Sequence, residues 1–217
     1  MQKKLSYDVD EIISVFDLQI GTNCSHLNNW ISATYTLSDY EQQQLNDLFD
    51  EIGDLVDYMN EEELKIRFVG SLFRIAKVDV KAKLRLFYER PLSAELKGYP
   101  LSVICDCMVA TPKGYNTPQN PYFFLQEAPS RPSPKGKENF YKAKNDPEGQ
   151  MLTAMLIAQH INNDEKPIYG GYLFGSSWRF TTLNGTEYCQ SRNFDTTRKE
   201  DTLQIVFLLK KLKDLVI

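Results

Sequence analysis

The spacing of apolar residues predicts helices in the first third of the chain. A short apolar helix is expected from about Val9 to Leu18. The run Ser38-Asp39-Tyr40-Glu41 has the capping-box pattern that opens a helix, and apolar residues then recur at helical spacing as far as Met59. Asn60 can cap a third helix. The apolar stripe of that third helix consists of Leu64, Phe68, Leu72 and Ile75.

After Lys77 the apolar pattern changes to the shorter runs that are typical of strands. Strands are expected at residues 84–89, 92–96, 101–110 and 122–127, with a turn at residues 97–100 and a loop at residues 111–121. A polar loop rich in proline and lysine should follow, over residues 128–146. These runs predict strands that are close neighbours in one sheet.

The last part of the chain alternates between a helix and strands. Asp146-Pro147-Glu148 is a strong helix start, because proline is favoured at the first helical position. That helix should end near Asn162, and Asn184-Gly185 should form a hairpin turn. Strands are expected at residues 168–174, 178–183 and 186–191, and a final helix at about 199–212. The order of elements predicts an α/β fold with a central mixed β-sheet flanked by helices.

Composition narrows the class of protein. The chain has 217 residues, of which 42% are hydrophobic and 25% charged, so one folded domain is expected rather than a disordered protein. No apolar run reaches membrane-spanning length and no secretory signal follows the first lysines, which predicts a cytoplasmic protein without membrane contact. The net charge of −4 means that any contact with nucleic acid must be local.

The four cysteines contain no Cys-x-x-Cys pair and only two histidines accompany them, which argues against a zinc site. Cys105 and Cys107 are two residues apart on a predicted strand. They are therefore expected to share one face of the sheet and to be reduced core residues.

Two carboxylates mark the candidate chemistry. Asp106 interrupts the apolar run 103–110, and Glu127 ends the apolar run 122–127. A carboxylate on a central strand must be neutral, paired or metal-bound, because an unpaired buried charge is costly. Adjacent carboxylates would suit Mg²⁺ or Mn²⁺. The simpler alternatives are that Asp106 caps a loop and that Glu127 is an ordinary charge at a strand end.

These positions resemble the PD-(D/E)XK nuclease pattern, in which an Asp on one strand is followed about twenty residues later by a strand ending in Glu-x-Lys, and then by a helix bearing a Gln. The matching residues are Asp106, Glu127 and Gln150, with Glu63 matching a Glu that some members carry on a preceding helix. The resemblance continues through residues 170–175 and the strand of Trp178, so it covers residues 61–217 and leaves 1–60 as an N-terminal helical extension.

The resemblance implies a restriction-endonuclease-like fold and Mg²⁺-dependent hydrolysis of a nucleic-acid phosphodiester, with Asp106 and Glu127 as metal ligands. Gln150 would position the site or the substrate backbone. Two structural alternatives stay open for the helix residues. Gln150 could pair with backbone at a sheet edge, and Glu63 could complete a capping box with Asn60. A bacterial source is suggested by the family alone.

The chain departs from the family where the pattern has its lysine, because it has Glu127-Ala128-Pro129 instead. That lysine would offset charge on the phosphate, and proline cannot do so. Lys135 or Lys137 in the following loop could replace it. A literal Glu95-Leu96-Lys97, with Asp79 before it, is rejected because a turn and a strand follow where the family has a helix.

Two other functions remain open. One is an inactive relative of the nucleases that binds nucleic acid or a protein partner, as Pro129 and the acidic balance favour. The other is an interaction module that uses the acidic helix of residues 38–59, and a homodimer is compatible with either. The basic residues between Arg131 and Lys144 are interpreted as a solvated loop, and the alternative is that they contact nucleic acid locally.

The aromatic residues expected in the core are Tyr169, Tyr172, Phe174, Trp178 and Phe180.

Overall fold

A single mixed β-sheet organises the chain. The computed structural model describes residues 5–21, 23–127 and 146–216, and the side chains of residues 61 and 123–127 fall outside this description. The strands are β1 (Gln19–Gly21), β2 (Arg85–Leu96), β3 (Tyr99–Lys113), β4 (Thr117–Glu127), β5 (Ile168–Phe174), β6 (Ser177–Asn184), β7 (Glu187–Gln190) and β8 (Phe194–Asp195). Their order is β1-β7-β6-β5-β4-β3-β2, and β8 pairs with β6. The pairs β1–β7 and β4–β5 are parallel and the others antiparallel, so the predicted mixed α/β class is confirmed.

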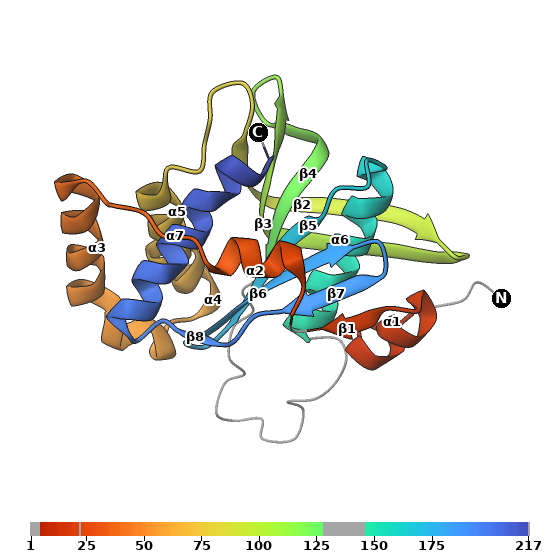
Figure 1. The fold of residues 1–217 in the computed structure, drawn as a ribbon, viewed down its shortest axis with the longest axis horizontal. Helices are drawn as coiled ribbons and strands as arrows, with labels where there is room; N and C mark the ends of the chain where they lie inside the picture. The colour runs from red at the N-terminus through yellow and green to blue at the C-terminus, as the bar shows by residue number, and fades with distance from the viewer. Residues whose placement is uncertain (1–4, 22, 128–145, 217) are drawn as a thin grey trace.

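Helices cover both faces of this sheet (Figure 1). They are α1 (Val9–Phe16), α2 (Ser25–Ile31), α3 (Asp39–Ile52), the 3₁₀-helix η1 (Gly53–Tyr58), α4 (Glu61–Glu63), the π-helix η2 (Leu64–Val69), α5 (Gly70–Ala76), α6 (Pro147–Asn162) and α7 (Lys199–Val216). Two cores result. The first joins α2, α3, α5 and α7 to one face of the sheet, and the second joins α1 and α6 to the other face. Within the described residues, no helix combines the length and apolar character that crossing a bilayer requires.

Local sequence signals set several of these elements. The capping box of Ser38 and Glu41 is present, with Glu41 N donating to Ser38 Oγ at 3.3 Å and Ser38 N donating to a Glu41 carboxylate oxygen at 3.0 Å. Asp146 caps α6 and Pro147 occupies its first turn, as predicted. The helix predicted to reach Met59 instead leaves α-geometry after Ile52 and continues as η1.

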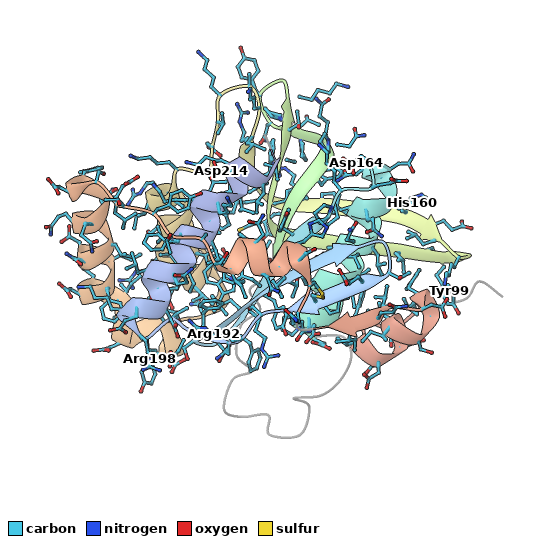
Figure 2. All side chains as sticks on the ribbon, viewed as in Figure 1. Tyr99, His160, Asp164, Arg192, Arg198 and Asp214 are labelled. Atoms are coloured by element: carbon cyan, nitrogen blue, oxygen red, sulfur yellow. A yellow bond between two sulfur atoms is a disulfide. The ribbon has the colours of Figure 1, made fainter. Side chains whose placement is uncertain are left out.

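The two strands predicted at residues 84–89 and 92–96 are one long strand, β2, which pairs with β3 on both sides of Glu89. Lys97 and Gly98 make the hairpin turn with φ of 50° and 79°. Figure 2 shows Tyr99 near this end of the hairpin, where Lys97 Nζ also contacts Asp17 just after α1, at 2.6 Å. Pairing with β3 therefore joins the two predicted strands across residues 90 and 91.

Residues before position 60 are built into the same sheet and cores. Strand β1, helix α2 and strand β8 were not predicted, and β1 pairs with the edge strand β7. Trp30 of α2 is fully buried, and its Nε1 donates to the Leu208 carbonyl at 2.8 Å. A disulfide between Cys24 and Cys189, with Cα atoms 6.3 Å apart, also joins this region to β7.

Most of the aromatic residues predicted to be core are buried. The exposed fraction is below 9% for Tyr169, Tyr172, Trp178 and Phe180, whereas Phe174 at the end of β5 is 37% exposed. Trp30 contacts Tyr169 and Phe180 edge-on, with centroid separations of 5.0 and 5.1 Å. These rings are therefore core contacts for the N-terminal segment.

Candidate active site

The alternation of side chains between the two faces of the sheet is interrupted in β3 at Asp106. Cys105 belongs to the core beneath α6, whereas Cys107 belongs to the core beneath α5 and α7. The prediction that these two cysteines share a face is therefore wrong, although both are buried and neither is part of the disulfide. Asp106 between them is only 8% exposed. The carboxylate predicted from the apolar run is thus a buried one.

The change coincides with an irregularity in the neighbouring strand. Tyr88 pairs with Cys107 and Arg90 with Cys105, and Glu89 between them has a φ of 50°. A non-glycine residue in this left-handed region costs about 1–3 kcal/mol and persists only where the surrounding structure imposes it. At this irregularity Glu89 and Asp106 both contact the same partner, Lys65 on η2.

Lys65 is a buried cation held by carboxylates. Its Nζ lies 2.7 Å from Glu89 Oε1, 3.3 Å from Asp106 Oδ1 and 3.4 Å from Glu62 Oε1. The exposed fraction of its side chain is 7%, against 73% for Glu62 and 56% for Glu89. Buried charges are tolerated when paired, so Lys65 and Asp106 stabilise one another inside the protein while the two glutamates also meet water.

Lys65 was not predicted from the sequence, because the family pattern places its lysine two residues after Glu127 or in the loop that follows. The two lysines considered there, Lys135 and Lys137, lie outside the described residues. A signal was nevertheless present. Lys65 shares helical spacing with the buried residues Phe68, Val69 and Leu72. A lysine at the start of a buried stripe needs an acidic partner, and that requirement points to Asp106.

The backbone of β4 brings position 127 to the same place. Cys107 pairs with Gln126 in the antiparallel register, so the next residues along each strand, 106 and 127, continue that register across from one another. Glu127 also pairs with Tyr172 on β5. The two positions that sequence analysis linked are therefore neighbours in the sheet, while the Glu127 side chain lies outside the described part of the chain.

The other two predicted residues lie on helices. Glu63 is exposed and forms a capping box with Asn60, with Asn60 N donating to Glu63 Oε2 at 3.0 Å and Glu63 N donating to Asn60 Oδ1 at 2.9 Å. Its neighbour Glu62 is the residue that contacts Lys65. Gln150 is half-buried in the first turn of α6, where its backbone N–H donates to the Asp146 carbonyl at 3.0 Å.

The carboxylate of Glu148 anchors the first turn of α6. Glu148 Oε2 accepts a hydrogen bond from Tyr172 Oη at 2.8 Å, and Gln190 of β7 donates to Glu148 Oε1. Burial raises the pKa of Glu148, and the Tyr172 hydrogen bond partly offsets that increase. Because Tyr172 pairs with position 127, these contacts tie the start of α6, and Gln150 with it, to the strand beside Glu127.

A pocket of about 440 Å³ opens beside Lys65. Its lining residues are Glu62, Lys65, Ile66, Gly70, Ser71, Arg74, Tyr88 and Glu89. Burial raises the pKa of Tyr88 to about 12, with smaller contributions from Cys107 and Asp79, so its hydroxyl stays protonated near neutral pH. The pocket gives a ligand access to Lys65 and Glu89 from solvent.

The residues of the rejected motif, Asp79 and Glu95-Leu96-Lys97, have separate partners. Lys97 pairs with Asp17, whereas Asp79 Oδ1 accepts a hydrogen bond from Leu86 N at 2.7 Å. Among the described side chains, three potential metal-binding atoms come within 4.8 Å of one another at Cys24, Glu187 and Cys189, and both cysteines there form the disulfide. No protein-family model matches the chain, and a search of curated proteins finds no match.

Proposed function

We propose that this chain is a restriction-endonuclease-like protein of the PD-(D/E)XK type that hydrolyses nucleic-acid phosphodiesters with Mg²⁺ or Mn²⁺, and that Lys65 takes the place of the missing motif lysine. The observation that carries this proposal is the buried Lys65, whose Nζ lies 3.3 Å from Asp106 Oδ1 at the edge of an open pocket. A lysine beside the motif aspartate would offset charge on the phosphate, which Pro129 cannot do.

The order of elements supports the proposal. The strand of Asp106 is adjacent to the strand of Glu127, and the next described element is α6, which carries Gln150. Asp106 and Glu127 would hold the metal, because hard divalent cations prefer carboxylate oxygens and the two positions directly follow the Cys107–Gln126 pair that joins β3 and β4. When bound, the metal would activate a water and polarise the phosphate. Lys65 would offset charge that develops on the phosphate oxygens.

The first test is calorimetric titration of Mg²⁺ and Mn²⁺ into the parent, Asp106→Ala and Glu127→Ala. We expect binding in the parent and its loss in both variants. Cleavage of labelled nucleic acid is then compared between the parent, Lys65→Met and the matched control Lys97→Met, whose lysine is 49% exposed and pairs with Asp17 instead. Lys65→Met should keep metal binding and lose cleavage, while Lys97→Met should keep both.

An inactive, binding-only protein is the second candidate, and one observation favours it. The Lys65 ammonium lies within 3.4 Å of three carboxylates, as a bound cation would. If Lys65 fills the cation position permanently, the parent should bind no divalent metal and cleave nothing, and Lys65→Met should gain metal affinity. The same variants therefore separate the two candidates.

The cytoplasmic location, the bacterial source and a homodimer stay part of this proposal. The Cys24–Cys189 disulfide argues against the cytoplasmic location, because such bonds are rare in cytosolic proteins. Alkylation of the protein in intact cells, followed by mass spectrometry, would show whether the two thiols are reduced there. Reduced thiols would support a cytoplasmic protein, and an oxidised pair would argue for an oxidising compartment.

A further inference from the structure

The walls of the Lys65 pocket differ in chemistry. Ile66 and Tyr88 provide apolar surface and are 70% and 42% exposed, although most large apolar side chains of the described chain are buried. Lys65 and Arg74 provide positive charge on the same pocket. A planar apolar ring beside cations suits a ligand that has a flat base at one end and a phosphate at the other.

We propose that this pocket takes one unpaired nucleotide, with its base against Tyr88 and Ile66 and its phosphate toward Lys65 and Arg74, so that the substrate is single-stranded nucleic acid. This inference rests on the proposed function, because it uses the same site. It adds the class of substrate, which neither the motif nor the fold specifies.

The shape of the pocket supports a single strand. Gly70 lines the pocket close to the ring, since a Cβ at that position would lie 3.2 Å from the Lys65 carbonyl and 3.5 Å from Tyr88 Oη. A volume of about 440 Å³ lies within the range of small-molecule sites, so the pocket suits one nucleotide better than a base pair with both of its backbones. A base within a duplex would have to leave its stack to enter, whereas a single strand presents its bases already unpaired.

The charges of the pocket predict a cation requirement. Glu62 and Glu89 line it together with Lys65 and Arg74, so positive charge does not dominate. A phosphate would be repelled by these carboxylates unless a divalent cation were bound nearby. We therefore expect binding of single strands to be strengthened by Ca²⁺, which has the same preference for oxygen ligands as Mg²⁺.

The test is fluorescence anisotropy with labelled oligothymidylate, oligouridylate and a hairpin duplex, each titrated in Ca²⁺ with the parent, Tyr88→Phe and Tyr88→Ala. Tyr115→Ala is the matched control, because Tyr115 is 98% exposed and lies in the β3–β4 turn. The parent should prefer either single strand to the duplex. Loss of the ring in Tyr88→Ala should weaken binding about 5- to 150-fold, while Tyr88→Phe should bind like the parent. Tyr115→Ala should have no effect.

Equal affinity for duplex and single strands, or unchanged binding in a folded Tyr88→Ala, would overturn the inference. Tryptophan fluorescence establishes folding, and Tyr88→Phe keeps the comparison valid if Tyr88→Ala unfolds, because a phenylalanine that binds far more weakly than the parent would also contradict stacking. The metal titration separates this inference from the proposed function. Metal binding without a preference for single-stranded nucleic acid would contradict this inference and leave the nuclease proposal standing. A preference for single strands that depends on Tyr88, without metal binding, would support the nucleotide pocket and contradict the nuclease proposal.

Discussion

The ion pair between Lys65 and Asp106 makes a prediction about stability that does not depend on any activity. Lys65→Met keeps an unbranched apolar stem, one atom shorter, and removes the charged ammonium. Glu62 and Glu89 are 73% and 56% exposed and can turn to water when the ammonium is lost. The Asp106 side chain is 11% exposed and stays buried without its lysine. The penalty should therefore fall mainly on Asp106.

Removing one partner of a buried ion pair costs about 3–5 kcal/mol, and we expect about 3 kcal/mol for Lys65→Met, because methionine keeps the apolar contacts of the stem. Asp106→Asn should cost less, about 1–2 kcal/mol, since Lys65 keeps Glu89 at 2.7 Å. The double variant removes both charges and should be within about 1 kcal/mol of the parent. Its loss should be smaller than the sum of the single losses by more than about 2 kcal/mol.

The assay is equilibrium unfolding in urea, followed by tryptophan fluorescence. Both Trp30 and Trp178 are fully buried, so unfolding will change their emission. Lys97→Met is the control, and its exposed ion pair with Asp17 should be worth less than about 1 kcal/mol. If Lys65→Met stayed within about 1 kcal/mol of the parent, or if the single losses added in the double variant, the account of a buried, mutually stabilising pair would be refuted.

Three further predictions concern other parts of the chain. A hydrogen bond from Lys210 holds the pKa of Glu41 at about 2, below its ordinary 4.5, so this carboxylate stabilises the fold above pH 4.5 and loses that effect as the pH falls toward 2. Acid titration of unfolding should therefore show a shallower decline for Glu41→Gln than for the parent, and equal slopes would contradict this. Gly149→Ala should lower the melting temperature, at a cost of about 2 kcal/mol, because its Cβ would overlap the Tyr7 carbonyl, and an unchanged melt would be inconsistent with that packing. Cys24→Ser should cost about 2–4 kcal/mol under oxidising conditions, and a reductant should destabilise the parent but not the variant, so equal sensitivity to reductant would contradict this prediction.

Signals that act over a few residues could be interpreted from the sequence. The capping box at Ser38, the proline at the start of α6 and the Asn184-Gly185 turn all predicted elements that the structure contains. In each case the side chain or backbone preference acts on its own turn, so no distant contact has to be known. The same reasoning found Asp106 from its place in an apolar run.

Elements that depend on distant partners were not predictable in this way. Strand β1 has three residues and exists because β7 offers an edge to pair with, and α2 is held by the burial of Trp30 against residues far along the chain. Short segments have weak local preferences, and tertiary contacts decide them. The union of two predicted strands into β2 has the same origin, because pairing with β3 continues through both.

The sequence by itself determined the mixed α/β class, most helix starts and two carboxylates on successive strands. Only the tertiary structure decided which cation meets them. Lys65 is 41 residues from Asp106 along the chain, and the two meet because the helical segment η2 packs on the sheet where Glu89 kinks β2. A contact of that kind depends on the three-dimensional path of the backbone, and no local preference encodes that path.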